Sequence, residues 1–147
     1  GGRISKSIDS TRHFMINHTG SVLAFVGDAI LTLQVREYLI KRGYTKSKDL
    51  QSLSEAFVSA KSQAEYSKYL LEQFPLSTEE LEMFKRGRNH KSDTIPKNAD
   101  VQTYRLATGL EAVWGYLYLT DNQQRLAQLW DIYKTFAEEN YGTIYIR

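Results

Sequence analysis

The sequence predicts an all-α fold, a helical bundle formed by a single domain. Apolar residues recur three and four positions apart along most of the chain, and no segment alternates apolar and polar residues as a half-buried strand would. These periodic segments are flanked by residues that are typical of helix starts and helix ends. With 147 residues, of which 41% are hydrophobic, and only 2 prolines, the chain is long enough to bury one core.

The first predicted helix begins near Ser21. Its apolar residues follow one another at spacings of four, three and four: Val22, Val26, Ala29 and Leu33. Lys41 and Arg42 fall in the last turn, where basic side chains are favoured. Gly43 then has the position of a residue that ends a helix.

A second helical region follows the segment YTKS and ends before Pro75, as either one long helix or two helices in line. Its periodic positions are Leu50, Leu53, Phe57, Ala60, Ala64, Ser67, Leu71 and Phe74. Ser77 and Glu80 then have the spacing of a capping box, which predicts a short helix that Gly87 closes.

Two further helices complete the prediction. One starts near Asp100 and runs through VQTYRLATGLEAVWGYLYL, and the stretch RGRNHKSDTIPKN before it is expected to be a loop. The last helix follows Asp121 and places on one face Leu126, Leu129, Tyr133 and Phe136. The predicted domain covers residues 20–147. Residues 1–19 are an N-terminal extension that we expect to be in part an expression remnant or a processed end.

The composition excludes several classes of protein. The chain has no Cys, which excludes disulfides and thiolate metal sites. It has neither an apolar run of about 18 residues nor a signal-peptide pattern, so we expect a cytoplasmic protein without membrane association. The net charge of +2 is small, but positive charge is concentrated near the middle of the chain. Residues 85–97 contain one acidic residue, Asp93, and five basic ones: Lys85, Arg86, Arg88, Lys91 and Lys97.

Two acidic residues stand in apolar helices without a basic neighbour. Asp28 follows Gly27 in AFVGDAIL, and Glu111 lies in TGLEAVWGYLYL. An ionised carboxylate that leaves water costs several kcal/mol unless something compensates it. Either each acid reaches solvent or a distant Arg, or the two share a divalent cation that waters help to coordinate. Gly27 and Gly115 allow another backbone or a ligand to come near.

The basic stretch before the second acidic helix is either solvated surface or a nucleic-acid contact. Lys and Arg neutralise phosphates without reading bases. No aromatic residue lies between Arg86 and Asn98, which disfavours a stacking platform for single strands. The residues that we expect to contact RNA are Arg88, Asn89, Lys91, Ser92, Lys97 and Asn98.

Several motifs resemble the ribonuclease III family. FVGDAIL is similar to its signature helix, L-E-F-L-G-D-A/S-V-L, and LEAVWGYLYLTD resembles its other catalytic helix, F-E-A-L-I-G-A-I-Y-L-D. The motifs SAKSQA, KRGRNHKS and PKNADVQTYR, with no double-stranded-RNA-binding domain in the sequence, narrow the resemblance to the small bacterial form, Mini-ribonuclease III. The resemblance extends from Gly20 to Gln128.

The resemblance implies a ribonuclease III-like endonuclease domain that works as a homodimer. It implies cleavage of double-stranded RNA with Mg²⁺ as the cofactor, for which Mn²⁺ substitutes, and products with 5′ phosphate and 3′ hydroxyl ends. Precursor 23S ribosomal RNA is the implied substrate, and a ribosomal protein is left open as a further partner. Carried over by motif, the catalytic metal ligands fall on Asp28 and Glu111.

The sequence departs from full-length ribonuclease III at two positions. That enzyme has a Glu four residues before the signature Asp and an Asp three residues before the second Glu, where this chain has Ala24 and Thr108. Mini-ribonuclease III lacks both acids too, so waters or RNA oxygens would complete the metal shell. The departure supports an alternative function, a dimeric ribosomal-RNA-binding or assembly factor that does not cut. The 3 His residues are scattered, which disfavours an HD phosphohydrolase or a Ser-His-Asp enzyme.

Overall fold

The structure, a computed structural model, describes residues 19–90 and 100–141. These two ranges contain helices and no strand, which confirms the all-α prediction. The helices are α2 (Gly20–Lys41), α3 (Ser47–Val58), α4 (Ala60–Gln73), α5 (Thr78–Arg88), α6 (Val101–Leu119) and α7 (Gln123–Tyr141). Within the described ranges, no helix combines the length and the apolar character that crossing a membrane requires.

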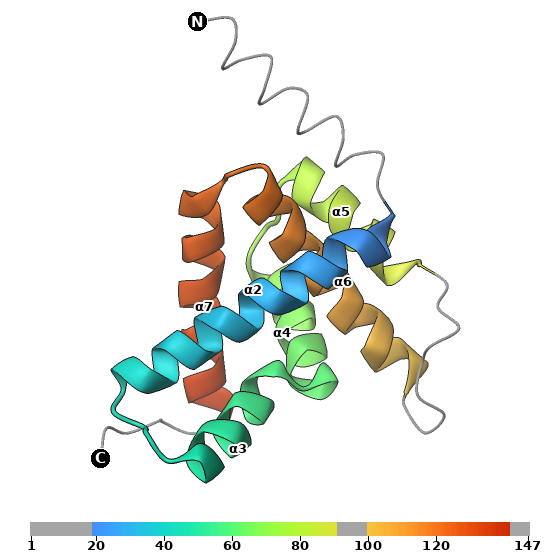
Figure 1. Cartoon of the computed structure of the whole chain (residues 1–147). Coiled ribbons are helices and arrows are strands. Elements are labelled where there is room, and N and C mark those ends of the chain that lie inside the picture. The colour runs from blue at the N-terminus through green and yellow to red at the C-terminus, as the bar shows by residue number, and fades with distance from the viewer. Residues whose placement is uncertain (1–18, 91–99, 142–147) are drawn as a thin grey trace, which may run out of the picture.

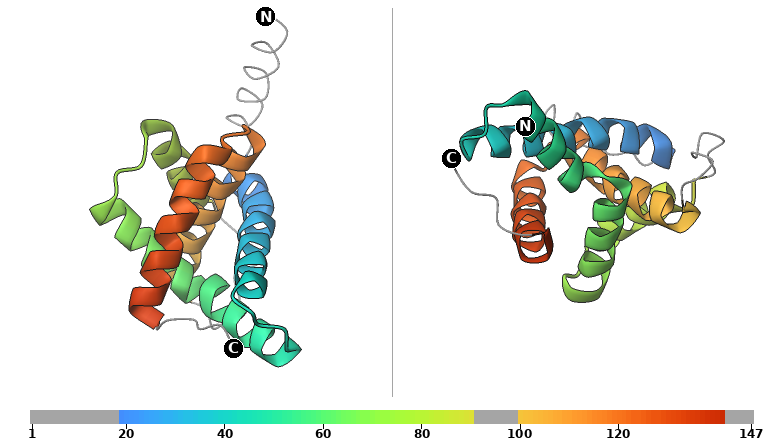
Figure 2. Two further views of the ribbon diagram at one scale, coloured as in Figure 1. Left: turned by 90° about the vertical axis from the view of Figure 1, so that its left-hand side faces the viewer. Right: turned by 90° about the horizontal axis from the view of Figure 1, so that it is seen from below.

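Helix α6 lies at the centre of the bundle and contacts α2, α4, α5 and α7. Helix α2 runs across it on the face nearest the viewer in Figure 1. Figure 2 shows α2 on one side of the molecule, with α4 and α7 on the other. This central position explains why α6 is apolar around most of its circumference, with ten buried residues that include Leu110, Val113 and Trp114.

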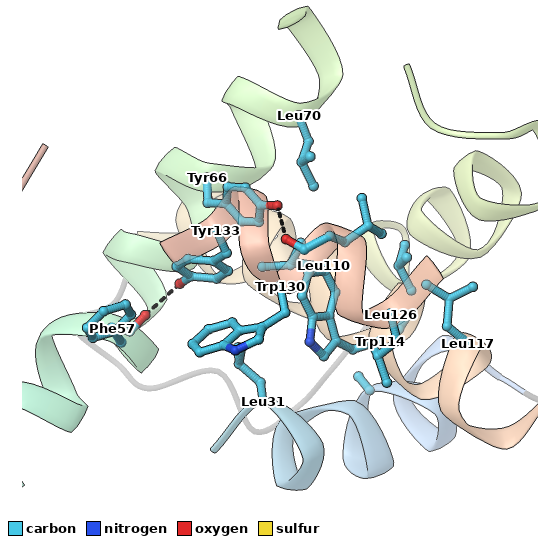
Figure 3. Packing of buried hydrophobic residues seen from close by; sticks show 14 of the residues in the cluster. Leu31, Phe57, Tyr66, Leu70, Leu110, Trp114, Leu117, Leu126, Trp130 and Tyr133 are labelled. Atoms are coloured by element: carbon cyan, nitrogen blue, oxygen red, sulfur yellow. Dashed lines mark hydrogen bonds between the residues drawn. The ribbon is translucent and has the colours of Figure 1, made fainter. Parts of the chain in front are cut away.

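Aromatic side chains fill the space that α4, α6 and α7 enclose (Figure 3). The Tyr66 hydroxyl donates to the carbonyl oxygen of Leu129, and the Tyr133 hydroxyl donates to that of Phe57. Both hydroxyl groups are buried, so these hydrogen bonds remove the cost of withdrawing them from water. The core therefore fixes α4 and α7 relative to each other beneath α6.

Most of the predicted helix ends are confirmed. Gly43 has φ 98°, the left-handed conformation, and its N–H donates to the carbonyl of Ile40 while that of Tyr44 donates to the carbonyl of Leu39. This pair of bonds is a Schellman motif. Ser77 and Glu80 form the predicted capping box at the start of α5.

The second helical region divides into α3 and α4 at Ser59, so the two-helix alternative is correct. Ser59 is extended, with ψ 152°, and its hydroxyl accepts a hydrogen bond of 3.2 Å from the N–H of Ser62 at the start of α4. The chain turns there, as Figure 1 shows. After the break, Ala64 and Ser67 are buried as predicted, but in the last turn of α4 Leu70 is buried in place of the predicted Leu71.

The prediction that Gly87 closes its helix is wrong. Helix α5 continues to Arg88, and Asn89 is its C-cap, so the first residues of the expected loop are helical. Gly87 is buried against α6, where an added Cβ would lie 2.7 Å from the carbonyl oxygen of Thr108. The glycine serves close packing between helices rather than helix termination.

The apolar face predicted for α2 points outward. Val22 and Leu33 are 44% and 53% exposed, whereas Leu23 and Leu31 are buried. Because α2 is apolar on several sides, its spacing does not determine which side meets α6. The side that carries Gly27 packs inward, because a glycine allows the closest approach.

Candidate active site

Helices α2 and α6 cross with their backbones in contact. A Cβ added to Gly27 would lie 1.7 Å from the carbonyl oxygen of Glu111, and one added to Gly115 would lie 1.9 Å from that of Leu23. Any side chain at either glycine would therefore push the helices apart. The crossing explains why Gly27 and Gly115 occur in these helices, and it brings Asp28, the next residue of α2, to Glu111.

Asp28 and Glu111 line one open pocket with a volume of about 310 Å³. Its walls come from α2, from α6 and from His90, which follows the C-cap residue of α5. The lining residues are Ser21, Ala24, Phe25, Asp28, His90, Tyr104, Arg105, Thr108 and Glu111. A larger hollow of about 730 Å³ lies between α2 and α3 and includes none of the predicted site residues. The structure thus brings the two predicted metal ligands together in a pocket open to solvent.

The two carboxyl groups lie within hydrogen-bonding distance of each other, and this changes the protonation of Glu111. Burial, the hydrogen bond to Asp28 and the negative charge of Asp28 raise the pKa of Glu111 to about 9. No Lys or Arg in the described ranges forms an ion pair with Glu111 or lowers its pKa. Glu111 therefore keeps a proton at neutral pH, and the hypothesis that a distant Arg compensates it finds no support in these ranges.

Gln63 of α4 is a third polar contact of this pair. Its side chain is buried, its Nε2 donates to the carbonyl oxygen of Val58 at 2.9 Å, and its amide also hydrogen-bonds Glu111, which lowers the pKa of Glu111. Its Oε1 is buried and accepts no hydrogen bond from the described residues. Gln63 was not predicted as a site residue. In the sequence it lies in SAKSQA beside two other polar residues, Lys61 and Ser62, so no local signal distinguishes it.

Ala24 and Thr108 line the pocket at the positions where full-length ribonuclease III has acids. The Thr108 hydroxyl donates to the carbonyl of Tyr104 in its own helix at 2.9 Å. In the described part of the chain, no group of three or more His, Cys, Asp or Glu side chains lies close enough together to hold a metal ion. The chain therefore offers two carboxylates to an ion, and water or substrate oxygens must supply the remaining ligands.

The end of α5 lies at the edge of this pocket, because Gly87 contacts Thr108 and His90 lines the wall. Two of the predicted RNA contacts, Arg88 and Asn89, are at this end, and the Arg88 Nε donates to the Asn89 Oδ1 at 3.2 Å. The other four predicted contacts lie outside the described residues: Lys91, Ser92, Lys97 and Asn98.

Three further lining residues were missed from the sequence: His90, Tyr104 and Arg105. A signal for Tyr104 was present. Tyr104, Thr108 and Glu111 are four and three residues apart, so they occupy one face of α6. The prediction for the face of α6 that carries Glu111 could therefore have included Thr108 and Tyr104, one and two turns nearer the start of the helix.

Comparison with known proteins identifies the family of the chain. The family described as Ribonuclease III domain matches residues 21–122. The Mini-ribonuclease 3 of Enterococcus faecalis is 49% identical over 110 residues, which cover 75% of this chain and 83% of that protein. The Mini-ribonuclease 3 of Streptococcus pneumoniae is 48% identical over 117 residues, which cover 78% of this chain and 91% of that protein.

A solved structure shows the same fold. The X-ray crystal structure of a protein from Fusobacterium nucleatum superimposes with a TM-score of 0.70 at 34% sequence identity, covering 79% of this chain and 91% of that one. Asp28 and Glu111 both fall inside the matched family segment. The chain therefore belongs to the ribonuclease III family and, within it, to the Mini-ribonuclease 3 group.

Proposed function

We propose that this chain, an endoribonuclease by family, uses Asp28 and Glu111 to hold Mg²⁺ and cuts double-stranded RNA in the cytoplasm. The substrate that we propose is precursor 23S ribosomal RNA. One observation carries the proposal: two carboxyl groups meet in an open pocket, and no basic side chain of the described residues compensates the more deeply buried one.

The donor set suits a hard divalent cation. Carboxylate oxygens are the ligands that Mg²⁺ prefers, and Mg²⁺ accepts one or two of them when waters and phosphate oxygens complete its shell. When bound, such an ion activates a water and neutralises charge on the phosphoryl group. Glu111 must lose its proton to become a ligand, so metal binding is coupled to proton release. We expect Mn²⁺ to substitute, since it accepts the same oxygen ligands.

The chain's own residues define what the pocket does to RNA. Asp28 and Glu111 would hold the ion near the α2–α6 crossing, and the basic end of α5 lies at the edge of the pocket, where phosphates can approach. Shape and backbone dominate recognition of A-form duplexes, so contacts from Arg88 and Asn89 need not read sequence. Cleavage is expected to leave a 5′ phosphate and a 3′ hydroxyl.

A homodimer accounts for the exposed apolar side of α2. Phe25 is 81% exposed and lies one turn before Asp28, and Val22 and Leu33 are also exposed. A second copy packed on this side would bury these side chains and would bring two pockets to one duplex, one for each strand. Sedimentation at micromolar concentration tests this, and a chain that remains monomeric with duplex RNA bound contradicts it.

A second candidate function is a dimeric ribosomal-RNA-binding or assembly factor that does not cut. The observation that favours it is the pair Ala24 and Thr108, which adds no carboxylate to the pocket. Against it stands the retained pair Asp28 and Glu111, because two acids that face a polyanion do not help binding alone.

A cleavage assay decides between the two functions. Wild type and Glu111→Gln are incubated with duplex RNA in Mg²⁺, in Mn²⁺ and in EDTA, and the 5′ ends of the products are analysed. We expect metal-dependent cleavage by the wild type only, with 5′ phosphates. Tight duplex binding without cleavage in either metal would overturn the nuclease proposal in favour of the binding factor.

A further inference from the structure

We propose that Arg105, with Tyr104 and His90, forms a subsite that binds a backbone phosphate of the RNA next to the bond that is cut. The inference rests on the proposed function, because it assigns a second part of the same pocket to the same substrate. None of these three residues belongs to the carboxyl pair, and none was among the RNA contacts predicted in the basic stretch.

The three side chains lie in the wall of the pocket that holds the acids. Tyr104 is seven residues before Glu111, on the same face of α6, and therefore about 10 Å away along the helix axis. Arg105 follows Tyr104 in α6, and His90 lines the same pocket from beyond the end of α5. Acids thus occupy one part of the pocket, and hydrogen-bond donors occupy another.

Arg105 has no partner within the described part of the protein. Three other arginines pair with glutamates there: Arg42 with Glu138, Arg86 with Glu82 and Arg125 with Glu80. Arg105 forms no such ion pair in these ranges, although Glu111 lines the same pocket. Nor does Arg105 contribute to the pKa shift of Glu111, which arises from burial, Asp28 and Gln63. Its guanidinium is therefore not held in an ion pair by any acidic residue of these ranges.

The chemistry of these groups favours a phosphate. A guanidinium matches two phosphate oxygens with parallel N–H bonds, and tyrosine and histidine add single donors. The charge of Asp28 repels a polyanion, so a cation at the other end of the pocket offsets that repulsion for the strand that passes over it. Bases of a duplex are paired and stacked, which leaves the backbone as the part that this wall can contact.

Binding without metal tests the subsite separately from catalysis. Fluorescence anisotropy of a labelled duplex RNA is measured in EDTA over a series of KCl concentrations for wild type and Arg105→Ala. We expect binding by Arg105→Ala to be about tenfold weaker at low salt. We also expect the slope of log affinity against log salt to fall by about 0.7–0.9, the value for one lost phosphate contact. Arg105→Lys keeps the charge and should keep the slope, with part of the affinity lost.

Lys68→Ala is the matched control. Lys68 is an exposed cation on α4 outside the pocket, and its removal should leave affinity and slope unchanged. Arg105 is itself exposed, so the fold should persist. Thermal unfolding checks this, and Arg105→Gln replaces the alanine variant if the latter does not fold.

The outcomes separate the subsite from the proposed function. Wild-type slope and affinity in Arg105→Ala, or a loss no larger than that of Lys68→Ala, overturn the subsite. If the wild type still cuts duplex RNA in Mg²⁺, the proposed function stands in that case. A wild type that neither binds nor cuts duplex RNA refutes the proposed function, and the subsite falls with it.

Discussion

Two glutamates of this protein are withdrawn from water, and they reach opposite protonation states. Glu80 of α5 is only 3% exposed, and Arg125 binds both of its oxygens, at 2.7 and 2.9 Å. Burial alone would raise the pKa of Glu80, but the hydrogen bonds from Arg125 and Ser77 outweigh it and lower that pKa. Glu111 has a second acid as its neighbour, and its pKa rises to about 9.

The comparison distinguishes an acid that stabilises the fold from one that does not. Glu80 ties α5 to the start of α7 through Arg125 and also caps α5 through Ser77. Glu111 forms no ion pair with a basic group of the described residues and shares its pocket with another carboxyl. Such a group costs free energy in the metal-free protein, so the fold gains no stability from it, which is consistent with the metal site proposed above.

The largest effect is expected from Glu111→Gln, which keeps the size of the side chain but removes the charge that a divalent cation requires. Cleavage of duplex RNA in Mg²⁺ should fall by more than about a hundredfold, since even indirect partners of metal ligands are worth about 10- to 100-fold. Duplex binding in EDTA should persist, and the midpoint of thermal unfolding in EDTA should stay or rise. Near-normal single-turnover cleavage combined with lower stability would show that Glu111 is structural.

The same change at Glu80 should have the reverse pattern. Glu80→Gln leaves the Arg125 guanidinium without its charged partner and should lower the free energy of unfolding by about 3 kcal/mol, the scale for breaking a buried ion pair. Cleavage should remain close to normal at temperatures at which the variant is folded. Glu82→Gln is the control on the same helix. It breaks the exposed pair with Arg86, and its effect on denaturant unfolding should stay within about 0.5 kcal/mol.

The two acids should also respond oppositely to pH. Between about pH 4.5 and 9, folded Glu111 keeps a proton that the unfolded chain has released, so its contribution to stability falls as pH rises. The limiting slope is about 1.4 kcal/mol per pH unit for one proton. Glu80, whose pKa is lowered, stabilises above the unfolded pKa and loses this contribution only as pH falls through its folded pKa.

Denaturant unfolding in EDTA across that pH range, at one protein concentration, measures the effect. The difference between wild type and Glu111→Gln isolates the contribution of Glu111 and of its interaction with Asp28, because the titrations of groups that contact neither acid cancel. We expect that difference to change steadily towards a less stable wild type at high pH. A difference that is constant from pH 5 to 9 would mean that Glu111 titrates normally in the folded protein.

The smallest effect is expected at Gln63, which contacts Glu111 from α4. Gln63→Leu removes a hydrogen bond that lowers the pKa of Glu111, so the proton is held more tightly and metal binding should weaken by about tenfold. The measurement is the Mg²⁺ concentration for half-maximal cleavage. Gln34→Leu is the matched control. It removes a hydrogen bond to Trp114 outside the pocket and should not change the metal requirement.

Signals that lie within one helix were readable from the sequence. Gly43 and the pair Ser77 and Glu80 were predictable because caps depend on residues a few positions apart. Asp28 and Glu111 were noticed because neither has a basic neighbour within one helical turn, and the structure brings them together. The resemblance to a known family, rather than periodicity, supplied their proposed role.

Features that arise between helices were missed. Gly87 has the local signature of a helix end, but its surroundings are set by α6, which no local pattern reports. Gln63 meets Glu111 across a helix interface for the same reason. The outward face of α2 was misassigned because Val22 and Leu23 are equally apolar, and only the depth of the glycine contact at Gly27 decides between them.

The glycine crossing of α2 and α6 also has a mechanical consequence. Where two helices touch through side chains, rotamer changes absorb thermal motion and neutral mutations before the backbones move. Main chain meets main chain at Gly27 and Gly115, so no rotamer is available to yield there. The distance between the main chains that carry Asp28 and Glu111 can then change only if a whole helix moves. Thermal motion and substitutions elsewhere in the core therefore have little effect on the main-chain positions of Asp28 and Glu111.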